Sequence, residues 1–191
     1  MPGSGILTQH FSEGLQLSLR DTIRLMMGYT DNTATTLVLD RIGLAYTAAA
    51  MEELGLPNTK IHAKVFRADT SIAPERSRRF GLGSTTAGEM IRLLEMIHAR
   101  KAATPSACEE MLAHLRACED RTSLPRFLPE GTKVAFKTGA VTAARTAAGI
   151  IESPRGPIAV CVLTSENKDR RWSDENAGKA LCGRIAKAVY D

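Results

Sequence analysis

The sequence is poor in aromatic residues and has no concentrated basic region. Aromatics make up 5% of the chain, and the net charge of +4 comes from scattered residues with only short runs, such as Arg76–Arg79 and Lys168–Arg171. A surface that binds nucleic acid needs a clustered basic face, usually with stacking aromatics. The composition therefore argues against nucleic-acid binding, whereas the mild positive balance suits a small anionic substrate.

Short metal-binding and redox motifs are also missing. Cys108, Cys118, Cys161 and Cys182 form no CxxC pair, and the histidines form no HExxH or other ligand spacing. We expect no metal site, and nothing in the sequence implies a cofactor. Cys161 lies in an apolar, strand-like run and Cys182 on the apolar side of a helix-like segment. Both are expected to be buried free thiols, while a disulfide between them stays open.

No targeting or membrane signal is visible. Residues 1–5 do not combine a charged region with a long apolar stretch, so the chain as written is expected to be neither exported nor membrane-spanning. Its 191 residues are 43% apolar and 24% charged, without repeats or low-complexity segments. This length and composition predict one globular domain, residues 1–191, with a core of its own.

Residues 1–128 are predicted to form a mostly helical lobe. Apolar residues recur at helical spacing, and Ser18 begins a segment that resembles a capping box. Residues 58–83 lose clear periodicity and read as a long loop, a kind of segment that is usually functional or disordered. The expected helices run from Ser18 to Tyr29, from Thr30 or Asp31 to Arg41, from Ala45 to Leu54, around Met90–Ile97 and around Cys108–Leu115.

The residue pattern of 129–191 differs from that of 1–128 and predicts three strands followed by a helix. The strands are Thr132–Lys137, Arg145–Ile151 and Ile158–Leu163, and the hairpin-length turn at 153–157 makes the last two antiparallel neighbours. A four-residue apolar step from Trp172 to Tyr190 predicts one long amphipathic helix on a face of the sheet. The expected fold class is α/β (α+β), with a mainly antiparallel sheet flanked by helices and a helical lobe.

Two short polar motifs lie at the boundaries of predicted helices and strands. Thr30-Asp31-Asn32 lies at a helix start, and Lys137-Thr138-Gly139-Ala140 closes an apolar strand. Each alone fits an ordinary helix cap or a strand ending in a turn. It is much less common to find both motifs in this order. Here a helical block lies between them, and a strand pair and a long helix follow them.

This combination resembles the class A β-lactamase and penicillin-binding-protein superfamily, whose motifs are Ser-x-x-Lys, Ser-Asp-Asn and Lys-Thr-Gly. The resemblance covers nearly the whole chain and implies a β-lactamase/transpeptidase-like fold that lacks the N-terminal strands and the nucleophile helix. The other matching segments are Gly3-Ser4-Gly5-Ile6-Leu7, Leu17-Ser18-Leu19-Arg20-Asp21, Met26, Asp31-Asn32-Thr33-Ala34 and Asp40-Arg41-Ile42-Gly43.

The resemblance assigns catalytic roles to three residues. Thr30 replaces the usual serine but keeps a hydroxyl that passes a proton to the leaving nitrogen, although its methyl group restricts the rotamer. Asn32 hydrogen-bonds a substrate amide carbonyl or the catalytic lysine. Lys137 places an ammonium near the Thr30 hydroxyl and the substrate carboxylate.

It also assigns substrate-binding roles to four residues. Thr138 contributes a hydroxyl, and Gly139, without a Cβ atom, lets a ligand lie against the strand. The backbone N–H of Ala140 supplies half of the oxyanion hole. Arg145 resembles the arginine that clamps the substrate carboxylate, with an exposed charge at a strand end as the alternative.

Two departures from the family pattern bear on activity. No Ser-x-x-Lys precedes Thr30, and the single match, Ser165–Lys168, follows the last strand, where we interpret it as a chance match. Met1 accordingly reads as an internal position of a longer family member. The second departure is in the long loop, which lacks the deacylating Glu with its downstream Leu-Asn. Asp69 and Glu75 are expected instead to pair with nearby arginines.

Three functions follow from the sequence. The first is a β-lactamase-like serine hydrolase acting on β-lactams or related amides and esters, impaired because the nucleophile is absent. The second is a non-catalytic protein that binds a small molecule with a carboxylate. The third is an interaction module, because loss of the N-terminal strands and central helix exposes apolar faces and predicts a homo-oligomer or a complementing chain.

Overall fold

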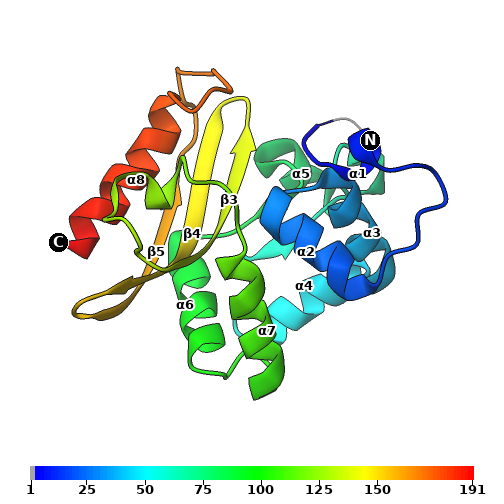
Figure 1. Ribbon diagram of the computed structural model, residues 1–191. Helices are drawn as coiled ribbons and strands as arrows, with labels where there is room; N and C mark the ends of the chain where they lie inside the picture. Colours follow the sequence, from blue (N-terminus) through cyan, green and yellow to red (C-terminus); the bar gives the residue numbers. More distant parts are fainter. Residues whose placement is uncertain (1–2) are drawn as a thin grey trace. The chain divides into compact units, whose positions relative to one another are not determined.

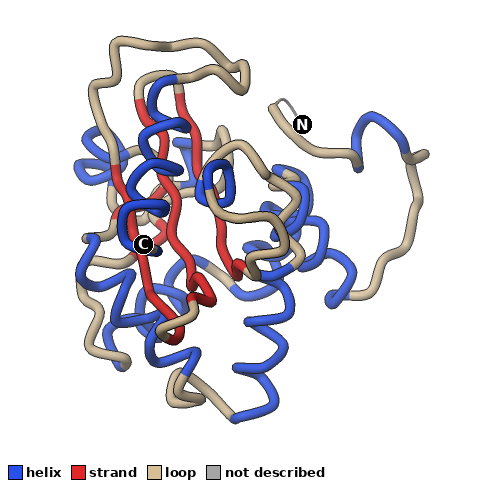
Figure 2. The backbone as a smooth tube through the Cα atoms, turned by 60° about the vertical axis from the view of Figure 1, so that its left-hand side comes forward, coloured by secondary structure: helices blue, strands red, loops and turns tan. Residues whose placement is uncertain are grey.

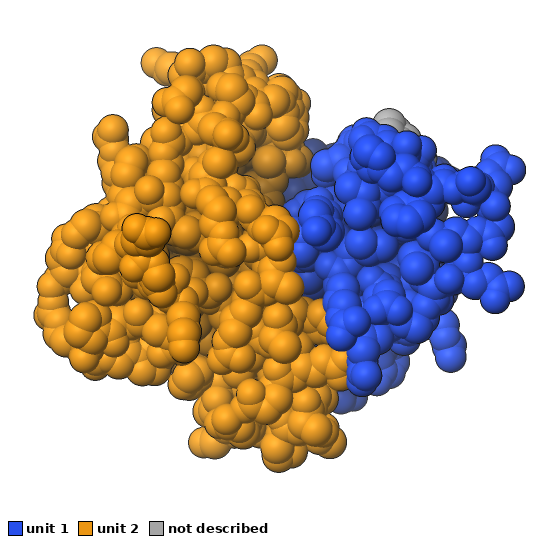
Figure 3. All heavy atoms as spheres, in the orientation of Figure 1, with its two compact units in different colours: residues 1–89 blue, residues 90–191 orange. Residues whose placement is uncertain are grey.

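The structure, a computed structural model, describes residues 3–191, so the prediction drawn from Met1 lies outside the described residues. The chain divides into two compact units, Met1–Glu89 and Met90–Asp191 (Figure 3). The single domain over residues 1–191, with a helical lobe over residues 1–128, stays a prediction. Within residues 3–191, no helix is both long and apolar enough to cross a membrane.

The first unit is mainly helical (Figure 1). Ser18 caps α2, since its hydroxyl accepts a hydrogen bond from the backbone N–H of Asp21 at 3.1 Å, and Gly43 ends α3 with a positive φ of 82°. These two signals place the helices within about two residues of the prediction. The helices are α1 (Leu7–His10), α2 (Leu19–Tyr29), α3 (Asn32–Ile42) and α4 (Leu44–Glu53).

The predicted loop over residues 58–83 is wrong in part, because much of this segment is ordered secondary structure. Strands β1 (Lys60–Ile61) and β2 (Gly83–Ser84) pair antiparallel, and Lys60 lies opposite Ser84. A 3₁₀ turn (Ala68–Thr70) and helix α5 (Pro74–Phe80) lie between them. Elements this short hold too few residues for periodicity to reveal them.

The second unit holds a three-stranded antiparallel sheet in the order β3-β4-β5, shown in red in Figure 2. The strands are β3 (Val134–Val141), β4 (Ala144–Ser153) and β5 (Gly156–Leu163). Ser153 pairs with Gly156 at the tight turn, which confirms the predicted hairpin. The helices are α6 (Ala87–His98), which begins before the unit boundary, and α7 (Pro105–Arg116), and both confirm predicted helices.

Helix α8 (Ala177–Tyr190) packs against β4 and β5 and closes the core of this unit. Phe136, Ile151, Cys182 and Ala186 are fully buried in that core. Burial of a side chain the size of Phe136 stabilises a fold by about 2–3 kcal/mol. The sheet and its covering helix thus hold β3, with its polar end, in a fixed frame.

The C-terminal helix starts later than predicted. Asn176 caps it, because its Oδ1 atom accepts hydrogen bonds from the backbone N–H groups of Gly178 at 2.9 Å and Lys179 at 3.3 Å. The residues from Trp172 to Asn176 therefore belong to the preceding loop. The open question of a disulfide is also answered, since Cys161 and Cys182 are free thiols and burial raises the pKa of each.

Candidate functional site

Thr30 connects α2 to α3 in a conformation that β-branched residues rarely adopt. Its φ and ψ of 54° and 41° lie in the left-handed region, and its backbone N–H donates to the carbonyl of Leu25. Such a backbone costs about 1–2 kcal/mol for a residue with a Cβ atom. Strain of this kind gathers at functional sites, and the catalytic role of Thr30 stays a prediction.

Asp31, the middle residue of the element, is a structural anchor. Its side chain is buried and caps α3 by accepting from the backbone N–H of Ala34 at 2.8 Å. The same carboxylate accepts from the N–H groups of Ile6 at 2.7 Å and Leu7 at 2.9 Å. Asp31 thereby ties the N-terminal segment to the turn that carries Thr30 and Asn32.

Asn32 begins α3 with its backbone N–H bonded to the carbonyl of Ser4 at 3.1 Å. The Ser4 hydroxyl in turn donates to the carbonyl of Thr30 at 3.0 Å. A Cβ atom on Gly3 would lie 2.1 Å from Asn32 Nδ2, and one on Gly5 would lie 2.5 Å from an Asp31 carboxylate oxygen. Glycine is therefore required in the segment that wraps this turn.

Lys137 lies on β3, one residue beyond Phe136, so its side chain leaves the opposite face of the sheet from the core. Its ammonium donates to the carbonyl of Thr138 at 2.9 Å. Burial lowers the pKa of Lys137, and the nearby Cys118 and Asp120 oppose that change. The strand thus presents a half-buried cation with an acidic neighbour.

The strand pairing explains the glycine of the Lys-Thr-Gly element. Gly139 lies opposite Thr146, and a Cβ atom on Gly139 would lie 2.6 Å from the Thr146 hydroxyl oxygen. Ala140, the next residue, is exposed at the end of the strand. Thr146 is therefore a close neighbour of Gly139 that sequence reasoning missed.

Arg145 is almost fully buried, at 2% exposure, so the alternative of an exposed charge at a strand end is wrong. Its Nη1 donates to the carbonyls of Val141 and of Ala144 (2.8 Å), and its Nη2 to the carbonyl of Arg171 at 2.7 Å. The guanidinium also stacks 4.7 Å from the ring centroid of Trp172. These contacts hold the turn between β3 and β4, and the predicted carboxylate clamp stays a prediction.

Ser165, the serine of the chance Ser-x-x-Lys match, is exposed in the loop between β5 and α8. The helix that follows begins only at Ala177, so Ser165 is not at a helix N-terminus. A nucleophilic serine gains reactivity from a hydrogen-bonded base beside it. The location agrees with the interpretation that this match carries no nucleophile.

The acidic residues of the segment 58–83 pair with arginines, as predicted. Asp69 accepts from Arg67 Nη2 at 2.7 Å, and Glu75 forms an ion pair with Arg78. Both pairs are exposed, so each contributes at most about 1 kcal/mol. Hydrogen bonding to Arg67 lowers the pKa of Asp69, which keeps this carboxylate ionised.

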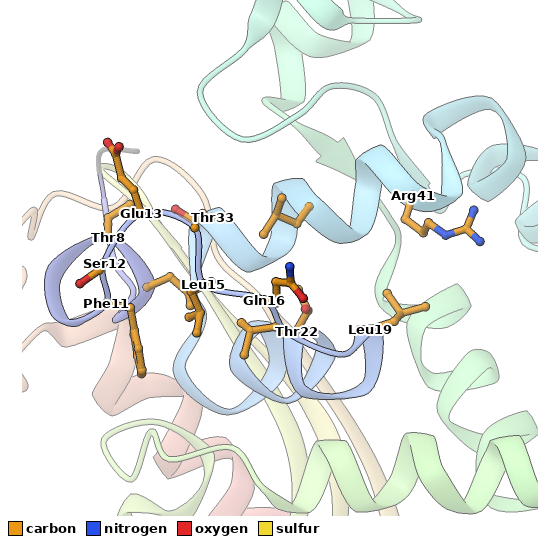
Figure 4. A pocket seen from close by; sticks show the side chains of 14 residues that line it. Thr8, Phe11, Ser12, Glu13, Leu15, Gln16, Leu19, Thr22, Thr33 and Arg41 are labelled. Carbon is orange, nitrogen blue, oxygen red and sulfur yellow. The ribbon is translucent and has the colours of Figure 1, made fainter.

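A groove of about 790 Å³ lies in the first unit beside the segment 7–19 (Figure 4). Its walls include the exposed apolar side chains of Phe11 (48% exposed), Leu15 (45%) and Leu37 (49%). Neither Thr30 nor Asn32 lines it. The groove is therefore a separate feature from the predicted catalytic residues.

The predicted site residues fall into two groups, one in each unit. Thr30 and Asn32 lie together on the turn between α2 and α3. Lys137, Thr138, Gly139 and Ala140 follow one another on β3, and Arg145 lies opposite Ala140 on β4. Sequence reasoning missed Ser4, since only the fold brings its hydroxyl to the carbonyl of Thr30.

Comparisons with known proteins give one consistent family. A family model described as the β-lactamase enzyme family matches residues 1–191, so the chain belongs to this family. Its fold is the β-lactamase/transpeptidase-like fold that the sequence predicted. A β-lactamase from Sphaerobacter thermophilus DSM 20745 is 27% identical, with a TM-score of 0.83 over 98% of this chain and 67% of that chain. No curated protein matches.

Two further solved structures agree on the fold. PBP-A is 25% identical, with a TM-score of 0.81 over 100% of this chain and 66% of its own. The TLA-1 extended-spectrum β-lactamase is 22% identical, with a TM-score of 0.85 over 100% of this chain and 70% of its own. The chain thus spans about two thirds of the length of these relatives.

Proposed function

We propose that this chain carries the substrate-binding and proton-transfer groups of a β-lactamase-like serine hydrolase. Its substrate would be a small molecule with a carboxylate, such as a β-lactam or a related amide or ester. The observation that carries the proposal is the half-buried Lys137 ammonium on β3, followed on the strand by Thr138 and Gly139. A cation with little access to water binds a carboxylate more strongly than a solvated one does.

The remaining groups have matching roles in acyl transfer. The Thr30 hydroxyl would return a proton to the leaving nitrogen, and Asn32 would hold the amide carbonyl of the substrate. The backbone N–H of Ala140 would stabilise the oxyanion. Support comes from a relative, since a point mutant of PBP-A, 25% identical to this chain, has been seen as an acyl-enzyme complex with penicillin G.

The proposed activity is impaired in this chain, because Ser165–Lys168 is its single Ser-x-x-Lys and Ser165 lies in an exposed loop. An oxyanion hole and binding groups without a nucleophile retain only a small part of the rate enhancement. We therefore expect binding of the carboxylate substrate with little turnover.

Hydrolysis of nitrocefin and of a p-nitrophenyl ester tests this proposal, together with mass spectrometry of the protein after incubation with penicillin. The account predicts no burst and an unchanged protein mass. A covalent adduct would show that the chain holds a nucleophile, and peptide mapping would locate it.

The second candidate is a non-catalytic carboxylate-binding protein derived from this fold. The observation that favours it is the exposed loop position of Ser165, the only serine with the nucleophile spacing. The same assays separate the two candidates. Slow hydrolysis that Lys137→Ala abolishes supports the impaired hydrolase, whereas binding with no turnover above buffer supports the binding protein.

A further inference from the structure

His62 is a histidine that the proposed site does not use, although its side chain is almost fully buried, at 1% exposure. Its backbone N–H donates to the carbonyl of Leu82 at 2.6 Å. Its own carbonyl accepts from the backbone N–H of Ile72 at 3.0 Å. His62, which directly follows β1, therefore joins that strand to the chain on both sides of α5 within the segment 58–84.

The hydrogen bonds of Ser84 indicate which ring nitrogen of His62 carries the hydrogen. The Ser84 hydroxyl donates to the carbonyl of Asn58 at 3.1 Å. Its oxygen accepts from Nη2 of Arg76 at 3.3 Å and lies 3.0 Å from Nε2 of His62. A hydroxyl has one hydrogen to donate and two lone pairs that accept, so Nε2 is the nitrogen that donates to Ser84. Nδ1 then carries the lone pair of the neutral ring.

Nδ1 of His62 is a buried atom without a hydrogen-bond partner among residues 3–191. Protonation would place an N–H group and a positive charge there, and a buried charge without a partner is costly. The surrounding charges oppose protonation as well, since Arg76 on α5 and Lys60 on β1 are both cations. Burial, and then the charges of Arg76 and Lys60, lower the pKa of His62.

The acidic side chains of the bordering elements are bound to other groups. They are Asp40 with Lys64, Glu52 with Lys60, Asp69 with Arg67, Glu75 with Arg78, and Glu89 with Asn58 and Thr59. A protonated His62 would therefore gain an acceptor for its new N–H group when the segment opens to water.

We propose that His62 is a pH-sensitive switch: its neutral ring holds the segment 58–84 closed against β1, and its protonated ring releases that segment. Backbone strain favours release, since Phe66 in the same segment has a φ of 56°, which bulky residues rarely adopt. The pKa of an unfolded histidine is about 6.5, and that of His62 in the folded chain is lower. The closed form is therefore fully stable above about pH 6.5 and loses stability as the pH falls below that value.

The switch bears on the proposed site, because this segment lies beside the turn that carries Asn32. A Cβ atom on Gly3 would lie 2.1 Å from Asn32 Nδ2 and 2.8 Å from Cε2 of Phe66, so the amide and the ring lie close to the same point. Lys64 also pairs with Asp40 of α3. Release of the segment would separate Phe66 and Lys64 from α3. This consequence rests on the proposed function, whereas the switch itself is a property of the free chain.

Amide hydrogen exchange of the free chain tests the switch, with Ile72 as the reporter because its N–H group bonds to His62. After correction for intrinsic exchange, the protection of Ile72 should fall about tenfold between pH 6 and pH 5, the effect of one proton. In His62→Gln, which keeps a donor for Ser84 but cannot ionise, the protection should stay constant. His10→Gln is the matched control, since it removes an exposed imidazole and should keep the wild-type pH dependence.

A second pair of variants leaves the buried position unchanged. In Arg76→Gln the loss of a neighbouring cation should move the ring titration of His62, followed by NMR, to higher pH. Arg78→Gln removes an exposed charge that pairs with Glu75, and it should leave the midpoint of His62 unchanged. In the wild type this midpoint should lie below that of the exposed His10. Equal midpoints for His62 and His10 would contradict the switch even if His62→Gln does not fold.

Protection of Ile72 that stays constant down to about pH 5 in the wild type, or falls equally in His62→Gln, would overturn the inference. Penicillin binding is the functional readout, since it should weaken below about pH 6 in the wild type but not in His62→Gln. A fall in protection without penicillin binding at any pH would support the switch and count against the proposed function.

Discussion

The carboxylate of Asp31 accepts a hydrogen bond from the backbone N–H of Ile6 at 2.7 Å, across 25 positions of sequence. The helix cap of α3 thus also fixes the N-terminal segment, because Asp31 is buried and also bonds Leu7 and Ala34. The middle residue of the Thr30-Asp31-Asn32 element is therefore the scaffold on which the outer two are held.

Asp31→Ala should destabilise the chain by about 3 kcal/mol, because three backbone donors, two of them buried, lose their acceptor. Denaturant unfolding measures the change. Asp40→Ala is the control, since Asp40 is exposed and pairs with Lys64, and its loss should cost less than about 1 kcal/mol. Equal losses in the two variants would contradict the anchor role of Asp31.

Thr30→Gly should stabilise the chain by about 1 kcal/mol, because glycine adopts the left-handed backbone of Thr30 without strain. Thr36→Gly, within the regular helix α3, should instead destabilise it by about 0.3 kcal/mol or more, because glycine has a lower helix propensity than threonine. Thermal or denaturant unfolding of both variants checks the opposite signs. A loss of stability in Thr30→Gly would mean that the Thr30 side chain contributes more than its backbone strain costs.

Asp169 should make the second unit sensitive to acid. Its hydrogen bonds to Arg171 and to the N–H of Ala177 hold its pKa well below the usual range. A carboxyl with a lowered folded pKa stabilises the fold above its unfolded pKa of about 4, and this contribution is lost as the pH falls further. In Asp169→Asn, stability should decline less steeply below about pH 4. Asp174→Asn, an exposed control, should keep the wild-type slope.

We expect the interface of the predicted homo-oligomer to be the groove of the first unit. Apolar surface such as Phe11, Leu15 and Leu37 is rarely left open on a monomer, and a second copy of this chain would cover it. Sedimentation velocity at micromolar concentration should show a dimer, and Leu37→Asp should give a monomer. Tyr46→Asp, exposed outside the groove, should leave the dimer unchanged. A monomeric wild type would refute this prediction.

Much of the fold could be predicted from the sequence, because its signals are local. The Ser18 cap, the Gly43 stop and the turn between β4 and β5 each act within a few residues. The apolar spacing predicts too early a start for α8, because it continues on the N-terminal side of the cap at Asn176. The short elements between residues 58 and 83 could not be predicted, because hydrophobic periodicity is visible only over a longer segment.

The site was harder to predict, because its supporting contacts are distant in sequence. The motifs located Thr30 and Lys137, but no pattern connects Ser4 to Thr30. No sequence pattern indicates that the side chain of Arg145 is buried. Its guanidinium contacts the carbonyl of Arg171 and the ring of Trp172, and only folding brings this loop after β5 to Arg145.

The central claim is that Lys137 holds the carboxylate of a β-lactam-like ligand. Calorimetric titration with penicillin G tests it in the wild type, in Lys137→Ala and in Lys133→Ala, a control at an exposed lysine before the same strand. The account predicts binding by the wild type and by Lys133→Ala, with affinity lower by about 10-fold or more in Lys137→Ala. No measurable binding by the wild type, or equal affinity in Lys137→Ala, would contradict it.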